Sequence, residues 1–230
     1  AVEIAAEIKR TGAPIPAPEK ITGIGQRAAR IDVREKVLGT GRYADDFSSS
    51  DFPGMVYGSA VRSAYPRARV LSIDKSEAEK VPGILCVATW EDIPGQNKIG
   101  HIKHDWATLI QVGNITRYLG DAIALVCGET MDAVEQAKKL VKIEYEELPA
   151  IFDPVKAMER GAPFVHKEGN ILAFEHLVRG DADEAIKNSA HVVTREYETP
   201  FTEHAFLEPE CAVAWADRVA GEVTIYSSDQ

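Results

Sequence analysis

Carboxylates and a histidine gather in one short polar stretch of the sequence, Thr199–Val213. Glu203 directly precedes His204, and Glu208 and Glu210 follow a few residues later. A histidine beside carboxylates titrates near neutral pH, so the stretch could supply a general acid/base pair. The same side chains are ligands that a metal ion could use. This stretch is therefore the first candidate for a functional site.

A structural role explains the same pattern. No second histidine stands at ligand spacing from His204, and Pro209 would interrupt a helical face that carried the carboxylates. We therefore expect hydrogen bonds of His204 and Glu208 to brace a sharp turn between two strands, with Glu203 in the same brace. On this interpretation the chain contains no catalytic residue and no metal ligand.

Strand-like sequences flank the polar stretch. His191–Glu198 alternates apolar and polar residues, as a half-buried strand does. Ala212–Trp215 and Glu222–Tyr226 have the composition of two further strands, with a turn over Asp217–Gly221. Because polar groups held by rigid strands are well placed for binding, we expect the bend at Phe201–Pro209 to form one rim of a binding pocket.

The composition is that of an ordinary globular protein, with 45% apolar and 27% charged residues among 230. The formal net charge of −10 argues against a nucleic-acid partner, because phosphate binding requires a basic face. No apolar run approaches the roughly 20 residues of a membrane span, and we expect no leader from the first residues, which lack a basic-then-apolar pattern. The three widely spaced cysteines, Cys86, Cys127 and Cys211, predict reduced core residues in a cytoplasmic, reducing compartment.

Strands and helices alternate in the middle of the chain. Strand patterns cover Met55–Arg62 and Ala68–Asp74. Two continuous apolar runs, Ile84–Trp90 and Asp121–Gly128, predict strands that are buried on both faces.

The sequence after the second apolar run completes the pattern. A helix should begin at the cap Thr130 and reach Lys142, and Lys142–Glu147 should form a strand with its glutamates on one face. The order strand, helix, strand predicts a mixed α/β (α+β) fold. Shorter helices are expected at three places: Ser76–Lys80, Asp153–Met158, and from the cap Asp181 to about Ala190.

Three short motifs carry less weight. Gly23–Ala28 imitates a dinucleotide fingerprint, but a proline-rich linker rather than a strand precedes it. Gly39 and Gly41 lack the Gly-Lys-Ser/Thr ending of a phosphate loop, so a turn followed by an extended segment is expected there. His101 and His104 lie in an irregular segment that we expect to be a solvated loop.

Four groups of residues along the chain resemble those of one family. They are Gly39–Asp46 with Pro53–Tyr57; Val61–Ser63 with Arg67–Leu71; Asp121–Val126 with Tyr145–Pro149; and Gly180-Asp181 with Tyr197–Pro200, Glu203-His204 and Leu207–Pro209. In this order they resemble the large subunits of the molybdenum hydroxylases, the xanthine dehydrogenase and aldehyde oxidase group. The resemblance covers the chain from Lys36 to Gln230.

The resemblance implies an α/β hammerhead domain followed by the first part of a molybdopterin-binding domain. We expect a helix end and a proline-rich linker over residues 1–18, the hammerhead domain over 19–160, and the truncated beginning of the molybdopterin-binding domain over 161–230. Ala1–Ala6 is similar to the last helix of the [2Fe-2S] domain in fused members of the family. The chain is thus expected to be an internal piece of a longer protein.

The resemblance also implies an activity for that longer protein, the oxidation of a purine such as xanthine, or of a related N-heterocycle or an aldehyde, with water as the oxygen source. It implies a molybdopterin (molybdenum) cofactor and [2Fe-2S] clusters on a neighbouring domain or subunit. The implied partners are the small-molecule substrate, the rest of the molybdenum domain, and iron–sulfur and flavin domains or subunits. The catalytic base and most pterin contacts are expected beyond Gln230, so the chain alone should bind no cofactor and have no activity.

Within the chain, the resemblance points to Phe201 and Thr202 as cofactor-binding residues. Xanthine-type members have Gly-Gly-Gln directly before Glu-His, and the glutamine reaches the oxo group of the metal. Pro200, Phe201 and Thr202 occupy those positions here, and the threonine side chain is shorter than glutamine. The competing interpretation is a non-catalytic α/β module that mediates assembly and binds no cofactor.

Overall fold

The computed structural model describes residues 25, 30–101 and 103–229. These residues divide into two compact units. The central unit comprises Gly54–Thr199, and the terminal unit comprises the described residues before Gly54 together with those from Pro200 onward. The helix end and the proline-rich linker expected over residues 1–18 lie outside the described residues.

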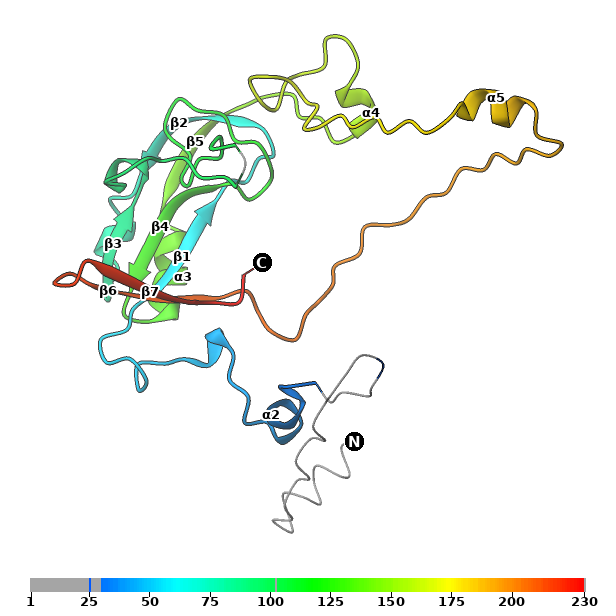
Figure 1. Ribbon diagram of the computed structural model, residues 1–230. Helices are drawn as coiled ribbons and strands as arrows, with labels where there is room; N and C mark the ends of the chain where they lie inside the picture. Colours follow the sequence, from blue (N-terminus) through cyan, green and yellow to red (C-terminus); the bar gives the residue numbers. More distant parts are fainter. Residues whose placement is uncertain (1–24, 26–29, 102, 230) are drawn as a thin grey trace. The chain divides into compact units, whose positions relative to one another are not determined.

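A three-stranded antiparallel sheet forms the centre of the central unit (Figure 1). Its strands are β1 (Tyr57–Arg62), β3 (Ile84–Ala88) and β4 (Ala122–Gly128), in the order β1-β4-β3. The helix α3 (Met131–Lys138) follows β4 and covers one face of this sheet. Its predicted cap is confirmed, because the Thr130 hydroxyl accepts a hydrogen bond from the Ala133 N–H at 3.2 Å.

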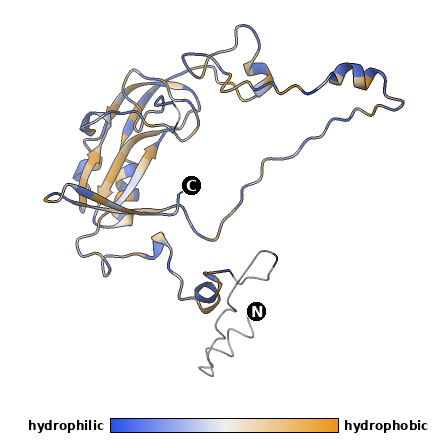
Figure 2. Ribbon diagram, in the orientation of Figure 1, coloured by the Kyte–Doolittle hydropathy of each residue, from blue (hydrophilic) through white to orange (hydrophobic). Residues whose placement is uncertain are grey.

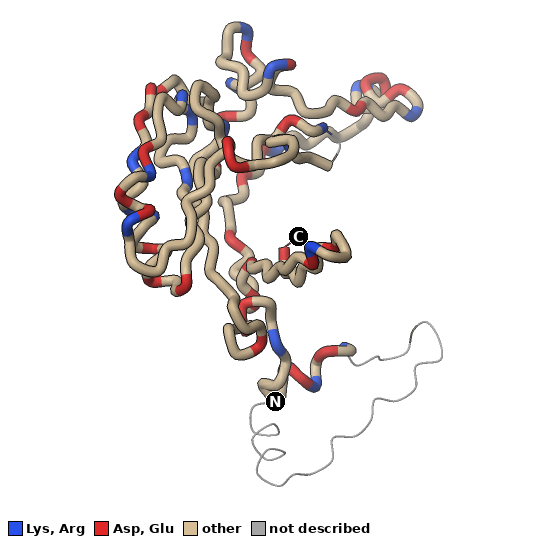
Figure 3. Tube along the Cα trace, turned by 90° about the vertical axis from the view of Figure 1, so that its left-hand side faces the viewer, with Lys and Arg blue, Asp and Glu red and all other residues tan. Residues whose placement is uncertain are grey.

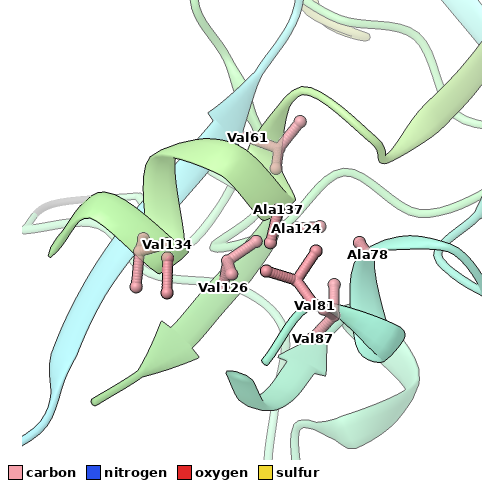
Figure 4. Packing of buried hydrophobic residues seen from close by; sticks show 9 residues of the cluster. Val61, Ala78, Val81, Val87, Ala124, Val126, Val134 and Ala137 are labelled. Atoms are coloured by element: carbon pink, nitrogen blue, oxygen red, sulfur yellow. The ribbon is translucent and has the colours of Figure 1, made fainter. Parts of the chain in front are cut away.

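Small apolar side chains fill the space between α3 and the sheet (Figure 4). Val126 of β4 and Val134 of α3 are completely buried, and Val87 of β3 is 1% exposed. Burying each of these valines contributes about 1.5–3 kcal/mol. The strands of this sheet are correspondingly the most hydrophobic part of the ribbon in Figure 2.

A second, two-stranded sheet pairs β2 (Ala68–Asp74) with β5 (Lys142–Glu147). Both strands have the bounds predicted from the sequence. Their outer face is polar, and the Arg69 guanidinium lies 3.0 Å from the Glu146 carboxylate. The inner face packs through Val70 against Ile110 and Ile123. Acidic residues, drawn red, and basic residues, drawn blue, are interspersed along the described chain (Figure 3).

The predicted burial of β3 is wrong. Leu85 is 57% exposed, and Cys86 is exposed rather than a core residue. These side chains are exposed because β3 lies at the edge of its sheet and only its face towards α3 is covered. By contrast, the prediction for β4 is largely confirmed, since this central strand buries Ile123, Ala124 and Val126.

Three short helices of the central unit lie where the sequence predicts them. They are the 3-10 helix η2 (Ala78–Lys80) and the helices α4 (Pro154–Ala157) and α5 (Ala182–Lys187). The 3-10 helix η3 (Trp90–Asp92) was not predicted. The Asp181 carboxylate accepts from the Glu184 N–H at 2.9 Å, which confirms that cap.

The terminal unit contains the antiparallel hairpin of β6 (Ala212–Asp217) and β7 (Glu222–Ser227). This hairpin and its turn confirm the sequence prediction. The unit also contains the helix α2 (Val33–Leu38) and the 3-10 helix η1 (Ala44–Asp46). The helix α2 was not predicted, and it ends at Gly39 in the left-handed conformation with φ 68°. No helix among the described residues is both long and apolar enough to cross a bilayer.

The strand predicted at His191–Glu198 is wrong. These residues form no regular element, and Val193 remains 76% exposed. An alternating pattern produces a strand only when a neighbouring strand accepts and donates the main-chain hydrogen bonds. No described segment pairs with this one.

Candidate cofactor-binding site

Ser228, directly after β7, fixes the end of the polar stretch to the hairpin. Its hydroxyl donates to the Pro209 carbonyl at 2.8 Å and accepts from the Cys211 N–H at 3.0 Å. Its own N–H donates to the Cys211 carbonyl at 3.1 Å. The residues before Cys211 therefore leave the hairpin from a defined position.

The stretch that contains the predicted cofactor-binding residues is extended and exposed. The Phe201 ring is fully exposed, and the Thr202 hydroxyl makes a 3.5 Å contact to the Pro200 carbonyl. Within the described part of the chain, the N–H groups of Phe201 and Thr202 have no hydrogen-bond partner. An aromatic face and main-chain donors and acceptors are thus available to a ligand.

The predicted bracing hydrogen bonds of His204 and Glu208 are absent among the described residues. The His204 ring instead stacks on Phe206, with the ring centroids 5.3 Å apart. The local turn is held by Glu203, whose carboxylate accepts from the Ala205 N–H at 3.3 Å. Ala205 has a φ of 49°, the left-handed value that a tight turn requires.

A cavity of about 390 Å³ lies beside the end of the stretch. Phe206 and Leu207 form its apolar part. Its polar lining consists of basic, acidic and hydroxyl side chains: Arg30 and Lys36, Glu208 and Glu210, and Tyr43 and Ser228. Lys36 also binds the Asp32 carboxylate at 2.8 Å. With Arg30, it lowers the pKa of Asp32 to about 2. The cavity can accept a polar ligand that carries both hydrogen-bond donors and acceptors.

Aromatic packing fixes the hairpin against the segment that includes η1. Phe47 stacks on Tyr226 of β7 at 5.5 Å, and Phe52 lies 5.2 Å from Trp215 of β6. The Arg42 guanidinium lies 4.6 Å from the Phe47 ring centroid and binds Asp51 through two hydrogen bonds of 2.8 and 2.9 Å.

This aromatic arrangement was not predicted from the sequence. Its signal was present in the aromatic residues of the predicted hairpin, Trp215 and Tyr226, which need apolar partners. No local sequence pattern predicts that these partners are Phe47 and Phe52, because both lie far from the hairpin along the chain.

His101 and His104 are both exposed. No cluster of three histidine, cysteine, aspartate or glutamate side chains with metal-binding geometry occurs among the described residues.

Comparison with known proteins identifies the fold. The model of the aldehyde oxidase and xanthine dehydrogenase α/β hammerhead domain matches residues 38–149, and that of the molybdopterin cofactor-binding domain matches residues 165–230. The chain belongs to the aldehyde oxidase and xanthine dehydrogenase family. Its members are molybdenum-dependent oxidoreductases, and the fold is a hammerhead domain followed by a molybdopterin-binding domain.

Two curated relatives of this chain are named for different substrates. The chain is 39% identical over 207 residues to the nicotinate dehydrogenase large molybdopterin subunit of Eubacterium barkeri, covering 90% of the chain and 47% of the relative. It is 39% identical over 201 residues to a probable xanthine dehydrogenase subunit of Bacillus subtilis, covering 87% of the chain and 26% of the relative. The chain therefore spans less than half of either protein.

A solved structure agrees with the family assignment. The aldehyde oxidoreductase of Desulfovibrio gigas superimposes with a TM-score of 0.77 at 27% identity, over 86% of this chain and 23% of that structure. The match shows that the chain shares its fold with part of this aldehyde oxidoreductase.

The exposed residues suit part of a molybdopterin site. A pterin is a flat ring system edged with hydrogen-bond donors and acceptors, and it is held by stacking and by main-chain groups. The Phe201 ring and the main-chain N–H groups of Phe201 and Thr202 offer both kinds of contact. The Thr202 hydroxyl can also donate a hydrogen bond.

Proposed function

We propose that the full-length protein is a molybdenum-dependent hydroxylase that oxidises a purine such as xanthine, or a related N-heterocycle, with water as the oxygen source. The match of residues 165–230 to a molybdopterin cofactor-binding domain is the observation that carries this proposal. The names of the two curated relatives, one for nicotinate and one for xanthine, favour a nitrogen heterocycle over an aldehyde.

We divide the chain into a linker over residues 1–18, a hammerhead domain over 19–160 and the beginning of the molybdopterin-binding domain over 161–230. When bound, the molybdenum cofactor supplies the redox chemistry of the hydroxylation. The partners that we propose are [2Fe-2S] clusters and a flavin on other domains or subunits, to which electrons leave the site.

Phe201 and Thr202 are the cofactor-binding residues of this proposal. The exposed ring of Phe201 would pack on the ligand, and the main-chain N–H groups of both residues, which have no partner within the described chain, would donate hydrogen bonds to it. The packing of Phe47 on Tyr226 supports the hairpin from which this stretch extends. The stretch is thereby held at one end while its middle is free to bind.

Large apolar side chains in the part of the chain that matches the molybdopterin-binding domain support a role within a bigger domain. Leu172, Leu177 and Leu207 are 88%, 97% and 84% exposed. Exposure of this degree is uncommon for leucine side chains in a completed core. In the proposal, the rest of the molybdenum domain covers these side chains.

The activity is tested on the full-length protein with xanthine, nicotinate and an aldehyde in heavy-oxygen water. We expect hydroxylated product from the heterocycles, carrying the label from water, and slower turnover of the aldehyde. Unlabelled product would contradict water as the oxygen source, and aldehyde turnover that exceeds both heterocycles would contradict the substrate class.

The binding residues are tested by the substitution Phe201→Ala in the full-length protein. Loss of the ring and its packing should lower the molybdenum content several-fold while the circular dichroism spectrum stays unchanged. Val219→Ala is the matched control, because Val219 is 99% exposed in the turn between β6 and β7, away from the stretch. Equal molybdenum loading of both variants would remove Phe201 from the site.

A further inference from the structure

Two cysteines lie directly opposite each other in the central unit. In the antiparallel pair of β3 and β4, Cys86 is the register partner of Cys127. Directly opposite residues of an antiparallel pair have Cα atoms about 4.5 or 5.5 Å apart. A disulfide bridges Cα atoms separated by about 4.4–6.8 Å. The backbone therefore already holds these two residues at the separation of a disulfide.

The two side chains also point to the same face of the sheet. Val126 and Val87, the neighbours of Cys127 and Cys86 in their strands, point towards α3 and are buried beneath it. Because successive residues of a strand alternate between faces, both thiols point to the face opposite α3. Both cysteines are free thiols in this structure.

The surroundings of the pair give its members different accessibility. Cys86 is exposed, whereas Cys127 is half-buried on the central strand. Burial, and then the adjacent Cys86 thiol, raise the pKa of the Cys127 thiol. A cavity of about 300 Å³ adjoins Cys86, with Leu85 and Lys75 in its lining, and gives a small oxidant access to this edge strand.

We propose that Cys86 and Cys127 form a reversible cross-strand disulfide when the protein meets a peroxide. The Cys86 thiolate attacks one peroxide oxygen, the O–O bond breaks, and Cys86 becomes a sulfenic acid as the first water leaves. The Cys127 sulfur then attacks the Cys86 sulfur, the S–O bond breaks and the S–S bond forms as the second water leaves. Two thiols lose two electrons in total, and hydrogen peroxide is reduced to two waters.

The disulfide would tie the edge strand β3 to the central strand β4. The strand β3 contributes Val87 to the core beneath α3, so the link would restrain one wall of that core. Disulfides in reducing compartments are typically transient and redox-sensing, which fits a pair that is reduced in the resting protein. A thiol reductant reverses the reaction by exchange.

The link is tested directly by mass spectrometry of the full-length protein after treatment with hydrogen peroxide. Trypsin would release Cys86 in the peptide 81–98 and Cys127 in the peptide 118–138, each with a single cysteine. We expect these two peptides to be joined, and dithiothreitol to separate them. Cys211, in the peptide 196–218, is the internal control and should not join either peptide.

Substitutions separate the two steps. In Cys127→Ser, Cys86 should accumulate as a sulfenic acid that dimedone traps, because no second thiol resolves it. In Cys86→Ser, the joined peptide should disappear and the melting temperature under reducing conditions should stay the same, because Cys86 is exposed. Oxidation should raise the melting temperature of the unsubstituted protein by about 5 °C, and should not raise that of Cys86→Ser.

The proposal is overturned if peroxide oxidises Cys86 beyond the sulfenic acid without producing the joined peptide. It is equally overturned if Cys211 joins either peptide as readily as the pair joins, because the register of β3 and β4 would then confer no selectivity. These outcomes do not depend on molybdenum loading or on turnover.

Discussion

Gly128 at the end of β4 should not tolerate a side chain. A Cβ atom there would lie 2.9 Å from the Gly83 carbonyl oxygen, 2.9 Å from the Ile84 Cδ1 atom and 3.2 Å from a methyl group of Val134. The first two distances are well inside van der Waals contact, which is about 3.5–4.0 Å between carbons. The Gly83 carbonyl cannot retreat freely, because it accepts a hydrogen bond from the Glu129 N–H at 2.8 Å.

The loss of stability expected for Gly128→Ala is that of an overpacked site. Forcing a methyl group into a packed site costs about 1–3 kcal/mol, so Gly128→Ala should destabilise the chain by that amount. Gly58 on the adjacent strand β1 is the matched control. A Cβ atom at Gly58 would meet the Cys127 sulfur at 3.5 Å and a Leu125 methyl group at 3.8 Å, which are ordinary contacts.

The control substitution should act in the opposite direction. Gly58→Ala restricts the unfolded chain and should leave stability unchanged or raise it by about 0.4–1 kcal/mol. Urea denaturation followed by circular dichroism measures both free energies of unfolding. We expect Gly128→Ala to fall below Gly58→Ala by at least about 1 kcal/mol. Equal stabilities would refute the close approach of β3, β4 and α3 at Gly128.

Three further predictions concern single interactions. Thr130→Ala should cost about 1 kcal/mol in urea denaturation because it removes the cap of α3, whereas Thr130→Ser should restore the cap; equal losses in both variants would exclude a capping role. Asn97→Ala should cost about 1–3 kcal/mol, because the Asn97 side chain pairs with both the N–H and the carbonyl of Leu109; an unchanged midpoint would contradict this. Arg42 holds the pKa of Asp51 well below its usual range. The ion pair therefore stabilises the folded protein fully at pH values above the usual aspartate pKa of about 4, and this stabilisation is lost as the pH falls towards the lowered pKa of Asp51. Asp51→Asn should therefore lower the melting temperature at pH 7 and lose this effect under strongly acidic conditions, and a deficit independent of pH would rule out the ion pair as its cause.

Local pattern was enough to predict much of the central unit. The alternation of Lys142–Glu147 gave β5 with its observed bounds, because its inner and outer faces differ sharply in polarity. Thr130 and Asp181 marked helix starts correctly, because capping depends on residues within one turn. The order strand, helix, strand predicted the mixed α/β class, and the family resemblance added the hammerhead and molybdopterin-binding domains.

The secondary-structure and burial predictions were wrong where the outcome depends on contacts between residues far apart in the sequence. Ile84–Ala88 is apolar enough for a central strand, yet it lies at a sheet edge, and strand order is not written in a local pattern. His191–Glu198 alternates as a strand does but pairs with no described segment. The helix α2 was missed because it has only six residues, too few to show a helical period, and none of them is buried.

The cofactor-binding role of Phe201 and Thr202 stays a prediction. The stretch around Phe201 is exposed, and His204 packs on Phe206 rather than bracing the turn by a hydrogen bond. The contact of Phe52 with Trp215 links distant parts of the sequence. Such contacts depend on the tertiary fold and leave no short motif.

The molybdenum and pterin content of the full-length protein, purified from a host that makes the cofactor, tests the central claim most directly. If the exposed stretch at Phe201 and Thr202 is part of a molybdopterin site, the protein should contain nearly stoichiometric molybdenum together with an equal amount of pterin. A correctly folded protein that contains neither would contradict the account.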